Sequence, residues 1–314
     1  MRLGFEAVKS ITFGAVSILL EENEIRFFKM TKSQMEAYRL LSEGLYNNSK
    51  NSTGIRLDFW TDSSYLAFLP ATGGKYEVKI DGLLSDFGPR EAGKEYRVAL
   101  PQDGKAHRVT LHLPSHGICA SLAYVELSDG AFLTPHTYDT KMLFIGDSIT
   151  QGWNSEIDSF AYAPLVADHF NAECIVQGVG GARYEPSTVE KLDFSPDTVI
   201  VAFGTNDAGD PNILSVLDGR CRETLEKLKN FYPDARIVVI TPIWRKDQDV
   251  LRAYGHVTLV ADCIASVAKS LGITVVDGLT LVPHAEHLFV DCVHPNDLGF
   301  AIYAHNLIKV LERL

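Results

Sequence analysis

The stretch MLFIGDSIT, residues 142–150, decides the fold of the second half of the chain. Its apolar run is followed at once by glycine and polar residues, and the run lacks the polar–apolar alternation of a half-exposed strand. Such a run is typical of a parallel strand that is buried on both faces of its sheet. Open α/β sheets bind their ligands beyond the carboxyl ends of the strands. The polar residues of this stretch are therefore candidates for a functional site.

The rest of the second half repeats this pattern. Further apolar runs occupy residues 174–177, 198–203, 236–241 and 274–277. Between them, apolar residues recur at helical spacing over residues 217–228, 260–271 and 300–311. Alternating strands and helices predict a parallel sheet with helices on both faces, which is a three-layer α/β/α domain.

The first part of the chain has a different pattern, with apolar residues at every second position. This alternation covers residues 55–59, 76–80 and 109–113, and glycine-containing turns separate the runs. Short strands at close spacing predict an antiparallel β-sandwich or jelly roll. Residues 30–46 are compatible with a helix. We therefore expect two domains, residues 1–137 and 138–314, joined near Leu133–Thr137.

Charge and composition exclude several classes of function. The net charge is −11, and it is concentrated in the second part, where 14 basic and 24 acidic residues follow Thr137. An acidic domain repels nucleic acids and anionic membranes, so neither is an expected partner. Five cysteines without close spacing argue against a disulfide framework or a zinc site. No signal peptide or membrane-spanning run is recognisable, so we expect a cytoplasmic protein.

Polar or glycine-rich blocks follow three of the predicted strands. They are GDS at 146–148, QGVGGA at 177–182 and GTND at 204–207, and DCVHP at 291–295 precedes the last helix. The geometry of a parallel sheet would gather all four on one edge. Acyl transfer needs a nucleophile with a base to take its proton, and Ser148 with His294 would supply both. Asp291, three residues before His294, would orient the base.

A tetrahedral intermediate also needs hydrogen-bond donors for its oxyanion. Three groups are candidates: the backbone N–H of Ser148, a backbone N–H of the glycine-rich block, and the side-chain amide of Asn206. Glycine lets the backbone approach a substrate without an intervening Cβ. Asp147 is expected to have a structural role, accepting backbone hydrogen bonds that hold the turn.

These four blocks resemble, in order and spacing, those of the SGNH (GDSL-type) hydrolase superfamily. The resemblance covers residues 141–314 and implies a flavodoxin-like sheet, Ser148 as nucleophile, and Asp291 and His294 as its partners. It places the oxyanion glycine at Gly181, with Gly180 as a rival, and the asparagine at Asn206. Gln177 departs from the asparagine of many members. The first part resembles, more weakly, the jelly-roll domain that precedes this catalytic domain in some carbohydrate esterases and acyltransferases.

Other residues are candidates for contact with substrate or metal. Trp153, Arg183, Tyr184 and Trp244 lie near the predicted strand ends and are expected to line a pocket, although a place in the core is as plausible for the aromatic residues. His284 and His287 have a spacing that some metal sites use, but no further ligand cluster supports them. We therefore expect neither a metal nor another cofactor.

The sequence thus predicts a serine esterase that hydrolyses short acyl esters, with O-acetyl groups on carbohydrates as the favoured substrate. The preference for a small or oligosaccharide ester rests on the family resemblance, the β-rich first part and the acidic charge. An acyltransferase would use the same acyl-enzyme. A non-catalytic carbohydrate-binding protein is a third interpretation, which the retention of every candidate catalytic residue disfavours. The sequence does not determine the oligomeric state.

Overall fold

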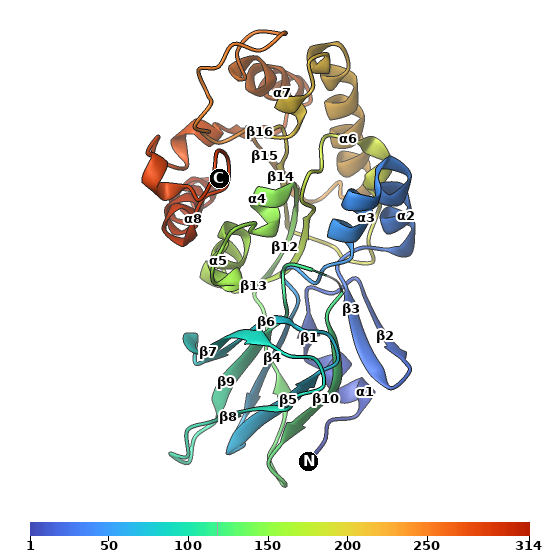
Figure 1. Ribbon diagram of the computed structural model, residues 1–314, viewed down its shortest axis with the longest axis vertical. Helices are drawn as coiled ribbons and strands as arrows, with labels where there is room; N and C mark the ends of the chain where they lie inside the picture. The colour runs from blue at the N-terminus through green and yellow to red at the C-terminus, as the bar shows by residue number, and fades with distance from the viewer. Residues whose placement is uncertain (118) are drawn as a thin grey trace.

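A computed structural model describes residues 1–117 and 119–314. The chain forms a β-sandwich, at the bottom in Figure 1, and an α/β part above it. Strand β12 (Thr140–Gly146) follows the sandwich directly and opens the α/β part. The fold class predicted from the sequence is confirmed.

The sandwich consists of two antiparallel sheets with a shared apolar core. Their strand orders are β2-β3-β10-β5-β8 and β1-β4-β9-β6-β7, and β11 pairs with β4. Phe27, Phe59 and Phe68 are fully buried between the sheets. The alternation seen in the sequence follows from this arrangement, because successive side chains of a strand point to opposite faces. The elements are α1 (Phe5–Ser10), β1 (Thr12–Phe13), β2 (Ser17–Glu21), β3 (Glu24–Phe28), β4 (Arg56–Thr61), β5 (Tyr65–Pro70), β6 (Gly74–Ile80), β7 (Leu83–Arg90), β8 (Tyr96–Ala99), β9 (His107–His112), β10 (Ser121–Leu127) and β11 (Thr134–Pro135).

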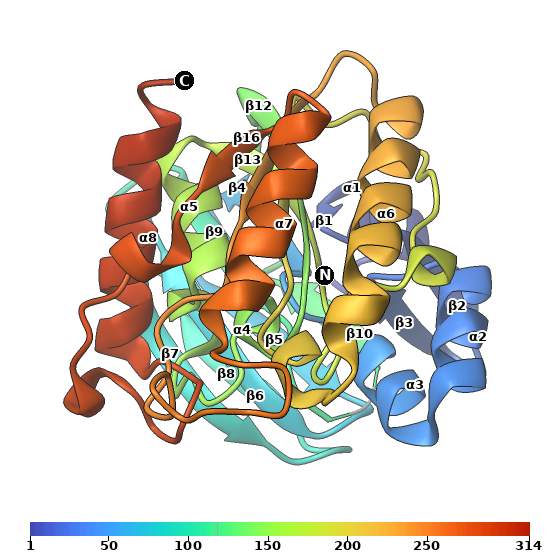
Figure 2. The same cartoon turned by 90° about the horizontal axis from the view of Figure 1, so that it is seen from above.

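The α/β part is built on a parallel sheet in the order β13-β12-β14-β15-β16, the flavodoxin-like arrangement. Helices cover both faces of this sheet (Figure 2). Leu143 and Ile145 pack toward α6 and α7, whereas Met142 and Phe144 pack toward α5 and α8. Burial on both faces explains why the runs do not alternate. The further elements are α4 (Ser148–Gln151), α5 (Tyr162–His169), β13 (Ala172–Gly178), β14 (Thr198–Ala202), α6 (Leu217–Phe231), β15 (Arg236–Ile240), α7 (Thr258–Ser270), β16 (Thr274–Val276) and α8 (Asp297–Leu311), with 3-10 turns η1 (Asp158–Phe160), η2 (Pro186–Thr188), η3 (Asp207–Gly209), η4 (Ile213–Ser215), η5 (Gly278–Thr280) and η6 (Glu286–Leu288).

Two helices that precede most of the sandwich in sequence lie against the α/β part (Figures 1 and 2). They are α2 (Lys32–Leu41) and α3 (Glu43–Ser49), and they occupy the stretch where a helix was expected. Thr31 and Gln34 form a reciprocal capping box at the start of α2. Tyr38 of α2 is buried in the same apolar cluster as α6 and α7. This helical pair therefore belongs by its packing to the α/β part, although it lies within the predicted first domain.

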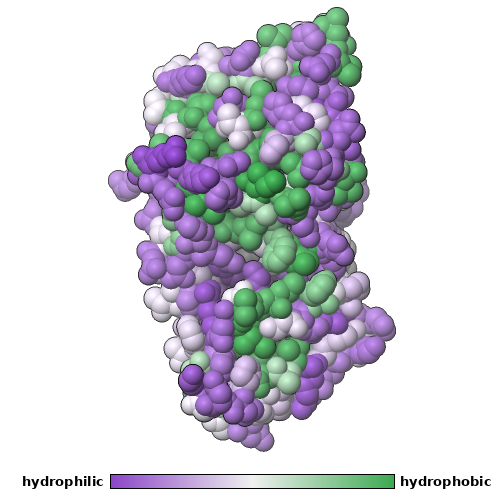
Figure 3. Space-filling model, turned by 90° about the vertical axis from the view of Figure 1, so that its left-hand side faces the viewer, coloured by the Kyte–Doolittle hydropathy of each residue, from purple (hydrophilic) through white to green (hydrophobic). Residues whose placement is uncertain are grey.

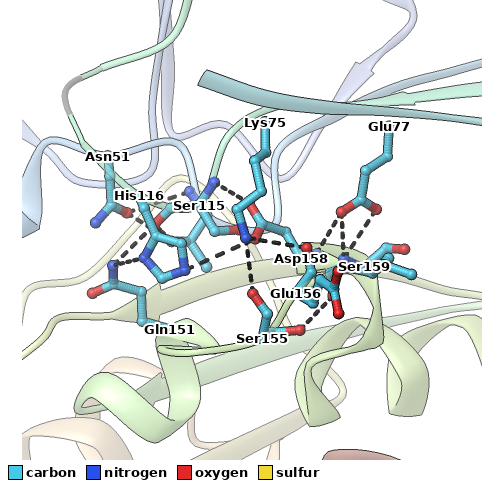
Figure 4. A network of polar contacts seen from close by, with 12 residues as sticks. Asn51, Lys75, Glu77, Ser115, His116, Gln151, Ser155, Glu156, Asp158 and Ser159 are labelled. Carbon is cyan, nitrogen blue, oxygen red and sulfur yellow. Dashed lines mark hydrogen bonds and ion pairs between the residues drawn. The ribbon is translucent and has the colours of Figure 1, made fainter. Parts of the chain in front are cut away.

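The two parts also meet through a polar network (Figure 4). Glu77 of β6 accepts hydrogen bonds from the backbone N–H groups of Asp158 and Ser159. Asp158 in turn accepts the N–H of Ser115 at 2.8 Å and pairs with Lys75 at 3.4 Å. Burial raises the pKa of Glu77, and the hydrogen bonds from residues 158 and 159 partly offset this effect. Buried hydrogen bonds of this kind fix the relative position of the elements that share them.

On the left-hand side of the view in Figure 1, apolar patches lie on both the upper and the lower part of the surface, with polar residues around them (Figure 3). No described helix combines the length and the apolar character that crossing a membrane requires.

An ion-pair cluster with buried cations and a partly exposed carboxylate provides a test of this interface. Asp168 of α5 pairs with Arg56 of β4 at 3.1 Å and with Lys79 of β6 at 3.2 Å. Burial tends to raise the pKa of Asp168, but the two cations outweigh it and lower the pKa to about 2. Asp168→Asn leaves both cations without their carboxylate partner. We expect a loss of about 1–3 kcal/mol in the free energy of unfolding, because 36% of the Asp168 side chain stays exposed to screening water and Arg56 keeps Asp58 nearby.

The pH dependence of this effect has a definite sign. Because the pKa of Asp168 is lower in the folded protein, its stabilisation is present above the unfolded pKa of about 4 and is lost as the pH falls toward 2. The difference between wild type and Asp168→Asn in denaturant unfolding should therefore shrink between pH 7 and pH 3. Glu173→Gln, which removes the exposed pair with Lys141, is the control and should change stability by less than about 0.5 kcal/mol. Equal losses in the two variants would contradict the interpretation.

Candidate active site

Ser148 lies at the start of the short helix α4, immediately after β12. Asp147 caps this helix by accepting the N–H of Ile149 at 2.9 Å, as the sequence predicted for a structural role. The helix comes very close to the end of β13, where a Cβ on Gly178 would lie 2.3 Å from the backbone nitrogen of Gln151. Glycine is therefore required at residue 178 for α4 to sit where it does.

Ser148, His294 and Asp291 form a continuous hydrogen-bonded chain. Ser148 Oγ and His294 Nε2 are 2.7 Å apart, and His294 Nδ1 is 2.7 Å from Asp291 Oδ2. The second oxygen of Asp291 accepts the N–H groups of Val293 and His294, each at 2.9 Å. The serine is thus within reach of a base, and the base is held in orientation by a third group, as nucleophilic catalysis requires.

The electrostatics of Asp291 suit this arrangement. Partial burial raises its pKa, but the backbone N–H of Val293 and the ring and N–H of His294 outweigh this and lower it to about 2. Asn154, which the sequence gave no reason to select, donates to Asp291 Oδ2 at 2.9 Å. Asp291 is therefore an anion at neutral pH and can stabilise a positive charge on His294.

The register of the sheet brings the oxyanion candidates beside the serine. Gly146 pairs with Gly178 on one side and with Ala202 on the other, so the loops after these strands flank α4. Within residues 1–117 and 119–314, the N–H of Gly181 has no protein acceptor, whereas the N–H of Gly180 donates to Gln151 Oε1 at 2.8 Å. Gly181 is also exposed and Gly180 is buried. These contacts favour Gly181 over Gly180 as the free donor.

Asn206 lies beside the same loop. Its side-chain nitrogen donates to the carbonyl oxygen of Ala182 at 3.0 Å. This bond uses one of the two N–H groups of the amide and holds the side chain in place, so the second N–H remains as a donor.

Two buried carboxylates support the strand ends without reaching the surface. Burial and the nearby charge of Asp207 raise the pKa of Asp147 to about 7, and burial raises the pKa of Asp207 to about 6. Asp207 accepts the N–H of Tyr184 at 3.3 Å. Asp147 thus holds the backbone at the start of α4, and Asp207 holds the backbone that follows the glycine-rich loop.

The four predicted pocket residues have different surroundings. The ring of Trp153 lies between His294 and His116, with centroid distances of 6.4 and 5.2 Å. Arg183 is partly exposed and pairs with Asp210 at 3.5 Å.

Of the other two, Trp244 is half-buried and Tyr184 is buried. Trp244 is stacked on His284 with centroids 5.6 Å apart and also packs against Phe289. Tyr184 is fully buried and packs against Phe203, so its side chain has no surface with which to contact a substrate. Tyr184 is therefore a core residue and does not line a pocket.

A pocket of about 480 Å³ adjoins the glycine-rich loop, a size typical of sites for small ligands. One wall is the loop itself, from Gly180 to Arg183, and the other is the helical pair α2–α3. Leu45 of α3 lies over Gly181, where a Cβ would be 3.4 Å from its Cδ2 atom. The remaining lining residues are Tyr38, Leu41, Ser42, Gly44, Asn48, Glu185 and Arg220.

Sequence reasoning missed the residues that the first part of the chain contributes. Gln151 donates to the carbonyl oxygen of Ser115 at 2.9 Å, and its side-chain nitrogen lies 3.3 Å from His116 Nδ1 (Figure 4). Asn48 donates to the carbonyl oxygen of Gly180 at 2.9 Å. These contacts join residues far apart in the chain, and no local motif marks them.

The metal alternative finds no support among the residues that the structure describes. His284 lies near the carbonyl oxygen of Leu279, at 3.1 Å from its Nε2 atom. No group of three or more histidine, cysteine or acidic side chains is arranged to bind an ion within the described ranges.

Comparison with known proteins places the chain in a family. Residues 144–302 match the model of the GDSL-like lipase/acylhydrolase family. A GDSL lipase of Mycobacterium tuberculosis is 30% identical over 147 residues, which are 44% of this chain and 59% of that protein. The chain thus matches somewhat more than half the length of this curated relative.

Solved structures share the fold over more of the chain. Salicylyl-acyltransferase SsfX3 from a tetracycline biosynthetic pathway has a TM-score of 0.81 at 21% identity, covering 96% of this chain and 95% of its own. A family 2 carbohydrate esterase with a carbohydrate-binding domain from Corynascus thermopiles (Myceliophthora fergusii) has a TM-score of 0.69 at 18% identity, covering 83% and 94%. The acetyl xylan esterase Est2A of Butyrivibrio proteoclasticus has a TM-score of 0.64 at 16% identity, covering 84% and 91%.

The family match spans half of the chain and includes Ser148, Gly181, Asn206, Asp291 and His294. The chain therefore belongs to the GDSL-like lipase/acylhydrolase family.

Proposed function

We propose that the protein is a serine esterase that removes short acyl groups, O-acetyl above all, from carbohydrate esters. The observation that carries this proposal is the hydrogen-bonded chain from Ser148 through His294 to Asp291. Membership of the GDSL-like family supports action on esters. The likeness to carbohydrate esterases, the β-sandwich and the acidic α/β part support a neutral sugar ester as substrate.

The reaction would proceed through an acyl-enzyme. Ser148 Oγ attacks the carbonyl carbon while its proton passes to His294 Nε2, and the electron pair of the C=O bond moves onto oxygen. The N–H groups of Ser148 and Gly181 and the amide of Asn206 stabilise this oxyanion. The intermediate collapses and expels the alcohol, which takes the proton from His294. Water then attacks the acyl-enzyme with His294 again as base, and the acid is released.

The pocket between the glycine-rich loop and α2–α3 would hold the alcohol moiety. Its volume of about 480 Å³ exceeds what an acetyl group needs. Its lining combines the apolar side chains of Leu41 and Leu45 with the hydrogen-bonding side chains of Arg183 and Glu185. A sugar presents hydroxyl groups and apolar C–H faces together, so this mixed lining suits it.

An acyltransferase is the second candidate, because the fold extends over nearly the whole of salicylyl-acyltransferase SsfX3. Both activities share the acyl-enzyme and differ in whether water or an alcohol accepts the acyl group. Product analysis with an acyl donor and a competing alcohol separates them: release of free acid supports the esterase, and acylated alcohol as the main product overturns it.

The nucleophile is tested with Ser148→Ala on p-nitrophenyl acetate, butyrate and octanoate. Removal of the attacking oxygen should lower kcat by several orders of magnitude, on the order of 10⁶ in another serine hydrolase. Wild type should be most active on acetate. Ser215→Ala changes an exposed serine of η4 and should retain full activity. Equal rates for Ser148→Ala and wild type would exclude Ser148 as nucleophile.

The role of Asp291 is tested with Asp291→Asn. The amide cannot hold the His294 ring in the required tautomer or balance its charge, so kcat should fall on the order of 10²–10⁴-fold. Because the pKa of Asp291 is about 2, its carboxylate stays ionised across pH 4–9, and it should cause no inflection in the wild-type pH–rate profile over that range. A variant with wild-type kcat would remove Asp291 from the mechanism.

The pocket assignment is tested with Leu45→Trp, which fills the space above Gly181. We expect kcat/KM for an acetylated xyloside to fall at least about tenfold, and that for p-nitrophenyl acetate to fall less, because the flat nitrophenyl group needs less room. Leu40→Trp, at an exposed position of α2 outside the pocket lining, is the matched control. Equal effects of Leu45→Trp on both esters would show that the sugar does not occupy this pocket.

A further inference from the structure

The loop that carries Gly181 is a tight turn with an identifiable type. The N–H of Ala182 donates to the carbonyl oxygen of Val179 at 3.0 Å, which closes a four-residue β-turn over residues 179–182. Gly180 and Gly181 are its central residues, and Gly181 has a φ of +86°. A positive φ at the third residue is the mark of a type II turn.

The peptide between Gly180 and Gly181 has a second possible orientation. In a type I turn the third residue has a φ near −90°, and the central peptide is turned over relative to type II. Glycine accepts both values of φ, so a pair of glycines offers little resistance to this flip. A peptide is planar and trans, and its C=O and N–H point in opposite directions. A flip would therefore exchange the N–H of Gly181 for the carbonyl of Gly180 at the oxyanion position.

The structure contains a restraint that selects one orientation. Asn48 Nδ2, from α3, donates to the carbonyl oxygen of Gly180 at 2.9 Å. Gln151 Oε1 accepts the N–H of Gly180 at 2.8 Å. Both sides of Gly180 are thus held by side chains from outside the loop. Because Asn48 draws the carbonyl oxygen toward α3, the N–H of Gly181 must point away from α3.

Asn48 is itself anchored to the same region. Its carbonyl oxygen accepts Asn51 Nδ2 at 2.7 Å. The fully buried Lys29 donates both to Asn51 Oδ1 and to the carbonyl oxygen of Gly178, the latter at 2.5 Å. The end of α3 and the start of the glycine-rich loop are therefore joined through one lysine side chain. The helical pair cannot shift without disturbing the turn.

We propose that Asn48 is a positioning residue of the oxyanion hole, which keeps the Gly180–Gly181 peptide in the type II orientation so that the Gly181 N–H faces the reacting carbonyl. The role of Gly181 as donor rests on the proposed function, whereas the orientation of the peptide does not. The α2–α3 helical pair then has two roles: it orients the oxyanion-binding peptide through Asn48, and it forms one wall of the pocket.

The kinetic test uses Asn48→Ala, with Asn47→Ala as a matched control. Asn47 is an exposed asparagine on the same helix, and only its backbone forms a hydrogen bond among the described residues. Loss of one oxyanion donor costs on the order of 10²–10³ in kcat, and partial flipping should cost about tenfold to a hundredfold. We expect this fall in kcat for Asn48→Ala with KM nearly unchanged, and wild-type kinetics for Asn47→Ala.

Asn48→Asp adds a signature that loss of packing would not produce. Its ionised carboxylate has no proton to donate and repels the carbonyl of Gly180, whereas the protonated form can donate as the amide does. The ratio of its kcat to that of wild type should rise as the pH falls from 8 to 5. The corresponding ratio for Asn48→Ala should stay constant over this range. A constant ratio for both variants would overturn the proposal.

A second readout is independent of catalysis. Backbone amide exchange of the segment 178–184, measured by mass spectrometry or NMR, should be faster in Asn48→Ala than in wild type and unchanged in Asn47→Ala. If the wild type hydrolyses no ester, this result still shows whether Asn48 holds the turn, so failure of the proposed function is distinguishable. Unchanged exchange in Asn48→Ala, or unchanged kcat in an active enzyme, would contradict the positioning role.

Discussion

The hydrogen bond between Ser148 Oγ and His294 Nε2, at 2.7 Å, is the contact on which the geometry of the site depends. It joins two residues that are 146 positions apart in the sequence, one near the start and one near the end of the α/β part. Ser148 is placed by the end of β12, and His294 is placed by the segment that leads into α8. The bond can form only because the parallel sheet brings the carboxyl ends of its strands to one edge. Asp291 then fixes the histidine through both its ring and its backbone.

The close approach of α4 to β13 is the second constraint. Gly178 leaves room for the backbone of Gln151, and Gln151 then binds the N–H of Gly180 with its side chain. The helix that begins with the serine thus also holds the loop that carries the oxyanion glycine. The proposed nucleophile and the proposed oxyanion donor are thus positioned by the same helix, and such preorganisation avoids rearrangement of a site during its reaction.

The first part of the chain reaches this unit from two directions. The segment around Ser115 and His116 contacts Gln151, and α3 contacts Gly180 through Asn48. Ion pairs and buried hydrogen bonds between β4, β6 and the α/β part hold the sandwich in a defined place. The β-sandwich and the α2–α3 helical pair therefore both support the candidate site physically.

The sequence by itself determined the fold class and the catalytic candidates. Buried parallel strands, amphipathic helices and alternating strands each leave a local pattern, and the blocks containing Ser148 and His294 lie directly at strand or helix ends. Other features depended on tertiary structure. The sequence left Gly180 and Gly181 as rivals, and the bond from Gly180 to Gln151 together with the exposure of Gly181 favours Gly181. The same holds for Asn48, which meets Gly180 across 132 residues of chain, and for Tyr184, which is buried despite its place beside the loop. Contacts of this range leave no local signal, because they are set by how separately folded elements pack together.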